Sequence, residues 1–169
     1  MTTPLDSTSS ERPPFERSSL ARLIVCARQG DWAVGLRREL PGPGARIDEA
    51  RSLPECWAML ARWPASLLVV ELTRRNAPAL VERMAWLGRD YPGARIAVVA
   101  ERSLAPWEGL VREAGAVHVT VSPRRLGPLA RLALRHLQAA PRRERSLAER
   151  IWDQLPWGTG DDEWQLDGR

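Results

Sequence analysis

The sequence contains no lysine, only two cysteines, and a single tyrosine and phenylalanine beside eight tryptophans. All 25 basic residues are therefore arginine, and the net charge is a mild +4. Abundant Ala, Arg and Pro without Lys is typical of GC-rich coding, so arginine content alone is weak evidence for nucleic-acid binding. Cys26 and Cys56 each lie in an apolar stretch, which excludes a disulfide framework and favours two buried thiols in a reducing compartment.

Long apolar runs are also missing. No uninterrupted run approaches the about 20 residues that a membrane span requires, so no membrane association is expected. Residues 1–19 are rich in Ser, Thr and Pro and lack the apolar core of a secretory signal, which predicts a disordered segment and a cytoplasmic location. Hydrophobic residues at 44% and charged residues at 27% are typical of one globular domain.

Common catalytic motifs are absent as well. The sixth residue after Cys26 is Trp32, where a cysteine phosphatase loop needs an arginine. His118 and His136 are the only histidines and are too far apart in sequence to suggest a metal site with the two cysteines. The sequence contains neither a glycine-rich phosphate loop nor a serine nucleophile elbow, so no catalytic residue, metal or cofactor is predicted.

Short apolar runs predict five strands. Residues 23–27, 67–72 and 96–100 are continuous and rich in β-branched residues and leucine, as in buried parallel strands. Residues 45–49 and 116–121 alternate more and are typical of outer strands.

Helical spacing fills the intervals. Ser52 and Glu55 form a capping-box pattern, Asp31 and Asn76 are expected to cap two further helices, and residues 106–114 and 123–138 complete the set. Alternating strands and helices predict a parallel sheet with helices on both faces. Sites in such sheets form beyond the carboxyl ends of the strands.

Residues 20–140 resemble the receiver domain of bacterial response regulators (the CheY-like family). The resemblance is carried by residues 22–26 as the first strand, 49–57 around the second strand's exit, 66–72 as the third strand, and 115–119 with Ser122-Pro123 around the fifth. It implies a flavodoxin-like, doubly wound five-stranded parallel sheet of order 2-1-3-4-5. It also implies a role in two-component signal transduction.

The resemblance further implies that the phosphorylation chemistry is lost. Receivers transfer a phosphoryl group to an aspartate with Mg²⁺ held by acidic residues. The acidic pair of the family falls on Ala27 and Arg28, the phosphoacceptor on Glu71, the switch hydroxyl on Ala100 and the lysine on Ser122. Glu71 is either a mimic of the phosphorylated state or a solvated carboxylate with Arg28 as its candidate partner. We therefore expect a pseudo-receiver that is not an enzyme.

The tryptophans divide into two groups. Trp57, Trp63 and Trp86 lie at helical positions that suit packing on the sheet. Residues 141–169 are predicted to form a charged helical extension and an acidic, Trp-containing tail. Its docking candidates are Trp152, Leu155, Pro156 and Trp157, because an aromatic anchor beside Pro and Gly binds at low entropic cost. Whether this tail docks on a partner or on its own domain is left open.

Arginines along the last helix, among them Arg131 and Arg135, form a candidate partner-binding stripe. The leading hypothesis is a phosphorylation-independent module that binds another protein through this helix, the tail or both. A nucleic-acid-associated regulator that uses the arginine stripe is the alternative, and an atypical phosphoacceptor at Glu71 is a third hypothesis. The sequence favours neither a monomer nor a homodimer.

Overall fold

The computed structural model describes residues 21–40 and 47–141. Five parallel strands form one sheet: β1 (Leu23–Cys26), β2 (Ile47–Ala50), β3 (Leu67–Leu72), β4 (Arg95–Ala100) and β5 (His118–Thr120). Their order is β2-β1-β3-β4-β5, which confirms the predicted flavodoxin-like topology. The segments predicted at 1–19 and beyond Pro141 lie outside the described residues.

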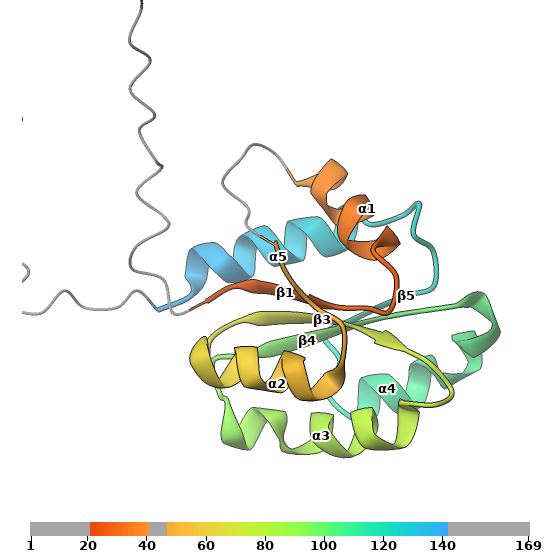
Figure 1. The fold of residues 1–169 in the computed structure, drawn as a ribbon, viewed down its shortest axis with the longest axis horizontal. Helices are drawn as coiled ribbons and strands as arrows, with labels where there is room; N and C mark the ends of the chain where they lie inside the picture. Colours follow the sequence, from red (N-terminus) through yellow and green to blue (C-terminus); the bar gives the residue numbers. More distant parts are fainter. Residues whose placement is uncertain (1–20, 41–46, 142–169) are drawn as a thin grey trace, which may run out of the picture.

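Helices cover both faces of the sheet (Figure 1). Helices α1 (Asp31–Glu39) and α5 (Gly127–Ala139) cover one face. The other face carries α2 (Leu53–Arg62), α3 (Ala77–Asp90), the 3₁₀ helix η2 (Arg102–Trp107) and α4 (Glu108–Glu113). No helix in this described part of the chain is long and apolar enough to cross a bilayer.

The core consists of two layers, one on each side of the sheet. Successive strand residues point to opposite faces, so Ile24, Leu68 and Val98 pack under α2, α3 and α4. Their neighbours Val25, Val69 and Val99 pack under α1 and α5. Because both faces are buried, the central strands are nearly continuous in apolar residues, and this is why the sequence reveals them clearly.

Helix starts match the sequence unevenly. Half of the capping box of α2 forms as predicted: Ser52 Oγ accepts a hydrogen bond from the backbone N–H of Glu55 at 3.3 Å. Glu55 Oε2 reaches back one residue further and accepts from the N–H of Arg51 at 2.7 Å instead of from that of Ser52. At α1, Gly30 precedes the helix and Asp31 is its first residue, without a side-chain cap. Asn76 also makes no cap and instead organises the preceding loop.

The last helix starts four residues later than predicted, at Gly127 rather than at residue 123. A helix begun at 123 would place Pro128 in its second turn, where the missing N–H removes a hydrogen bond. Starting at Gly127 puts Pro128 in the first turn, where no N–H partner is needed. Residues 122–125 form a turn closed by the N–H of Arg125 and the carbonyl oxygen of Ser122, 3.2 Å apart.

The described tryptophans on α2 and α3 only partly follow expectation. Trp57 packs partly buried against the core. Trp63 is half-buried between the guanidinium groups of Arg22 and Arg62, 5.5 and 4.9 Å from its ring centre. Trp86 is 50% exposed, so its predicted packing on the sheet is wrong. It lies on the outer side of α3, whose inward side is made by Leu80, Met84 and Leu87.

Candidate functional site: the two edges of the sheet

The five receiver-pocket positions lie at the carboxyl edge of the sheet. Ala27 and Arg28 follow β1, Glu71 is the penultimate residue of β3, Ala100 ends β4 and Ser122 follows β5. Strand pairing aligns Leu72 with Ala100 and Cys26 with Val70, which brings the ends of β1, β3 and β4 together. The fold therefore gathers the positions that the sequence assigned to one pocket.

Glu71 is held by the backbone of the β1–α1 loop. Its Oε2 accepts a hydrogen bond from the backbone N–H of Arg28 at 2.8 Å. Residue 28 thus contacts Glu71 through its main chain. The Glu71 carbonyl oxygen accepts a second bond, from Asn76 Nδ2 at 2.7 Å, while Asn76 Oδ1 accepts from the N–H of Thr73. Glu71 is half-buried and is the only acidic residue among the five receiver-pocket positions.

Arginines are frequent in the loops that follow the strands at this edge. Apart from Arg51 after β2, which pairs with Glu49, these loops expose six arginines, two after β3, two after β5 and one each after β1 and β4: Arg28, Arg74, Arg75, Arg102, Arg124 and Arg125. Helices α1, α2, α3 and α5 begin at the same edge, so the positive ends of their dipoles add to the arginine charge. We call these six residues the arginine rim; it is electropositive.

The residues at this edge do not fit the Mg²⁺ ion that receivers use. Magnesium takes oxygen ligands and is held by carboxylates. Ala27 offers no side-chain oxygen, Arg28 offers a cation, and the carboxylate of Glu71 is already bonded to an N–H. Across residues 21–40 and 47–141, no three His, Cys, Asp or Glu side chains gather in a way that could hold a metal ion.

Cys26, at the end of β1, and Cys56, on the buried side of α2, lie in the same core layer, and both are free. The thiol of Cys56 is hydrogen-bonded to Cys26 and fully buried, and both effects raise the pKa of Cys56. A neutral, buried thiol is a poor nucleophile. Both thiols are buried, as predicted.

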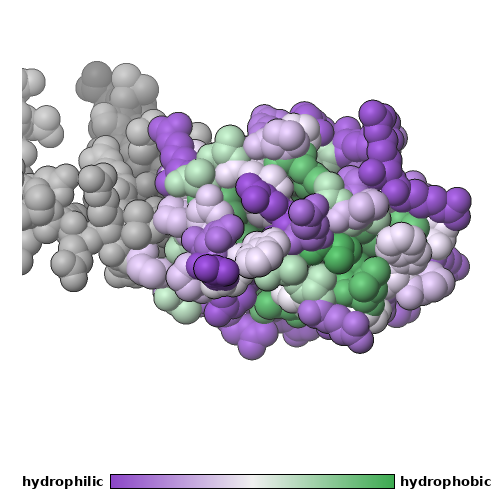
Figure 2. All heavy atoms as spheres, turned by 90° about the horizontal axis from the view of Figure 1, so that it is seen from below, coloured by the Kyte–Doolittle hydropathy of each residue, from purple (hydrophilic) through white to green (hydrophobic). Residues whose placement is uncertain are grey.

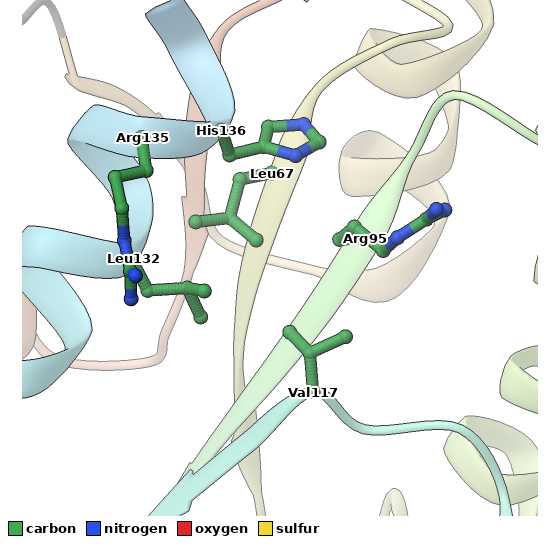
Figure 3. A pocket seen from close by; sticks show the side chains of 6 residues that line it. All are labelled: Leu67, Arg95, Val117, Leu132, Arg135 and His136. Carbon is green, nitrogen blue, oxygen red and sulfur yellow. The ribbon is translucent and has the colours of Figure 1, made fainter. Parts of the chain in front are cut away.

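At the opposite, amino edge the structure contains a hollow of about 350 Å³. It is lined by Leu67, Arg95 and Val117 from the starts of β3, β4 and β5, and by Leu132, Arg135 and His136 from α5. Figure 3 shows α5 on one side and the start of β4 on the other, with Leu67, Leu132 and Val117 between them. Its floor is thus apolar, and Arg135 places a cation on the α5 side.

Sequence reasoning missed this hollow apart from Arg135. Its residues come from four separate segments, and the rule for parallel sheets directs attention to the other edge. One signal is readable afterwards: Arg95 opens an otherwise apolar strand. Its guanidinium Nη1 donates to the carbonyl oxygens of Pro92 and Ala94 at 2.9 and 2.7 Å.

The partner-binding candidates divide between described and undescribed residues. Arg131 and Arg135 are exposed and lie one turn apart on α5, and Arg135 but not Arg131 lines the hollow. Trp152, Leu155, Pro156 and Trp157 lie outside the described residues.

Comparison with known proteins gives likenesses in structure alone. No protein-family model and no curated protein matches the sequence. The structure is similar to a response regulator from Thermotoga maritima, with a TM-score of 0.56 and 17% identity over 70% of this chain and 98% of that one. It is also similar to a CheY-like protein (TadZ) from Pseudomonas aeruginosa PAO1, with a TM-score of 0.53 and 18% identity over 67% and 98%. The chain therefore has the fold of response-regulator receivers.

Proposed function

We propose that this chain is a receiver-fold interaction module that acts without accepting a phosphoryl group. The observation that carries the proposal is the bond between the Arg28 N–H and Glu71 Oε2 at 2.8 Å. It ties one of the two oxygens of Glu71, the only carboxylate among the five pocket positions, to a backbone donor of the β1–α1 loop. In-line attack also needs a metal that balances the charge of the phosphodonor and acceptor, and these five positions offer no second carboxylate to hold one.

Neighbouring positions support the same proposal. Ala100 has no hydroxyl to contact a phosphoryl oxygen, and Ser122 has no cation to balance its charge. The arginine rim repels Mg²⁺. A carboxylate at Glu71 that mimics a phosphoryl group would find no hydroxyl at position 100 and no cation at position 122 to bond. This favours a surface with one constant conformation over a switched one.

Exposed apolar side chains on the surface support binding to another protein. Large apolar side chains are exposed on the helical layer and beside β5: Trp86 at 50%, Leu110 at 47%, Val117 at 39% and Trp107 at 38%. Figure 2 views the side of the molecule that carries α3 and α4 and shows apolar residues gathered among hydrophilic ones. Exposed apolar patches of this kind mark interaction surfaces.

The first experiment tests phosphoryl acceptance. The chain is incubated with Mg²⁺ and a small phosphodonor such as acetyl phosphate, and its intact mass is measured. We expect no phosphoryl adduct. The matched control carries Ala27→Asp, Arg28→Asp, Glu71→Asp and Ser122→Lys, which restores three carboxylates and a cation and should gain Mg²⁺-dependent labelling. Labelling of the unmodified chain that is lost in Glu71→Gln would overturn the proposal in favour of a phosphoacceptor at Glu71.

The second experiment identifies the class of partner. The full chain and a version ending at Pro141 are used for affinity purification from the native host across a salt series. We expect one protein to be retained by the full chain. The exposed pair Arg131 and Arg135 favours nucleic acid as the second candidate. Retained nucleic acid that leaves steeply with salt in both versions would support that alternative, because phosphate contacts release counterions.

A further inference from the structure

We propose that the hollow at the amino edge binds the chain's own acidic segment, residues 161–164, with Trp164 on the apolar floor. This docking is independent of whether the chain accepts phosphate.

The chemistry of the hollow defines its occupant. Leu67 is fully buried at the floor, Leu132 is half-buried and Val117 is 39% exposed, so an apolar group seated there would cover surface that now faces solvent. Arg135 is exposed and flanks the floor on the α5 side, while Arg95, also exposed, lines the opposite side with its guanidinium directed away from α5. Among the described residues that line the hollow, none is acidic. An aromatic side chain next to carboxylates complements such a surface.

One segment of the chain has this composition. Asp161, Asp162 and Glu163 immediately precede Trp164. Residues 151–169 contain five acidic residues and one basic residue, so the net charge of this tail is opposite to that of the hollow. Trp152 and Trp157 lack a run of adjacent carboxylates, which makes Trp164 the better match to the arginines that line the hollow.

Chain length and direction place this segment within reach. His136 lies in the last turn of α5, which ends at Ala139, and Arg135 immediately precedes it, so the helix ends beside the hollow. From Ala139 to Asp161 there are 22 residues. They span at most about 70 Å when extended, against about 20 Å for the whole of α5.

The hollow is also held in shape before anything binds. His136 Nε2 lies 2.8 Å from the carbonyl oxygen of Ala65, which ties α5 to the turn before β3. The bonds of Arg95 Nη1 to Pro92 and Ala94 fix that side chain at the opposite flank. Tethering gives the tail an effective concentration on the order of millimolar, so even a weak intrinsic affinity suffices for docking within one chain.

The test uses the full chain labelled with 5-fluorotryptophan. The ¹⁹F resonance of Trp164 is assigned with Trp164→Phe, and its solvent isotope shift between H₂O and D₂O is measured. We expect Trp164 to lose most of the shift that a free tryptophan shows, at low salt and independently of protein concentration. Arg135→Glu should restore the full shift. Its matched control, Arg131→Glu, changes an exposed arginine one turn away that does not line the hollow, and should leave the protection intact.

A charge exchange completes the design. Combining Arg135→Glu with Asp161→Arg and Asp162→Arg should recover the protection that Arg135→Glu alone removes. A full isotope shift at Trp164 in the unmodified chain would overturn the proposal, as would equal effects of Arg131→Glu and Arg135→Glu. Protection that disappears on dilution would overturn it in favour of docking on a second copy.

Discussion

The two ends of β3 are fastened to β1 by the same device in opposite settings. At the amino edge, Ser66 Oγ accepts a hydrogen bond from the backbone N–H of Arg22 at 2.9 Å and donates to the carbonyl oxygen of Trp63 at 2.7 Å. At the carboxyl edge, Glu71 Oε2 accepts from the N–H of Arg28 at 2.8 Å. Ser66 is fully buried and Glu71 is half-buried.

The contrast between the two edges shows that the loops can differ in chemistry while the strands keep the fold. In parallel α/β folds the carboxyl edge carries the loops that normally hold a site. Here those loops expose six arginines, and Glu71 is the only carboxylate among the five receiver-pocket positions. The strands beneath remain apolar, because both faces of the sheet are covered. Loop chemistry can thus change without loss of the fold, while the amino edge provides an apolar hollow with Arg135 on its α5 side.

Removing the buried anchor should have the largest effect. Ser66→Ala leaves the N–H of Arg22 without its acceptor in a buried place, while the carbonyl oxygen of Trp63 keeps only the backbone N–H of residue 66 as a donor. We expect the free energy of unfolding to fall by about 1–3 kcal/mol, measured by urea unfolding. Ser103→Ala is the matched control, because Ser103 is exposed after β4, and should stay within about 0.5 kcal/mol of the unmodified chain. Equal effects of the two changes would mean that burial does not distinguish the anchors.

The sheet was predictable from sequence because its signal is local. Three of the strands are runs that need apolar side chains on both faces, so composition alone reveals them. Helix starts were harder to predict. Asp31 is the first residue of α1 rather than its cap, and Asn76 occupies the N-cap position of α3 without a side-chain cap bond. The Asn76 side chain instead bonds the N–H of Thr73 and the carbonyl oxygen of Glu71, so residue type alone does not decide between capping the helix and closing the loop before it.

The two candidate sites also differ in how far they could be predicted from sequence. The positions of the carboxyl edge could be predicted because topology brings strand ends together. The bond between Arg28 and Glu71 joins residues 43 apart through a backbone group, so no residue pattern encodes it. The hollow could not be predicted, because it depends on how α5 lies across the starts of three strands.

Removing the half-buried anchor, Glu71, should have a smaller effect. Glu71→Ala deletes the acceptor for the N–H of Arg28, but water can replace it at this half-buried position. We expect the free energy of unfolding to fall by about 1 kcal/mol. Glu71→Gln retains an acceptor oxygen and should lose less. Glu101→Ala, at an exposed acidic position of the same edge, should change little. A loss at Glu71→Ala as large as that at Ser66→Ala would contradict the contrast between the edges.

Acid sensitivity near neutral pH should arise between the two edges, along β5. Burial lowers the pKa of His118 below its ordinary value of 6.5, and the nearby Arg112 cation lowers it further, while Glu108 acts in the opposite direction. The unfolded chain therefore binds a proton at a pH where folded His118 does not. Above about pH 6.5 His118 is neutral in both states and does not affect the free energy of unfolding. Below that pH the unfolded chain gains a proton that folded His118 does not, so the free energy of unfolding should fall as the pH drops towards the lower folded pKa.

His118→Gln should flatten this dependence, so urea unfolding at pH 8 and pH 5 should differ less in the variant than in the unmodified chain. Arg112→Gln should flatten it only in part, because burial is the larger cause of the shift. The effect should be the smallest of the three, since one partly buried imidazole carries it. Parallel pH profiles for the unmodified chain and His118→Gln would place the acid-sensitive group elsewhere, and the two anchored edges would then be the next places to look.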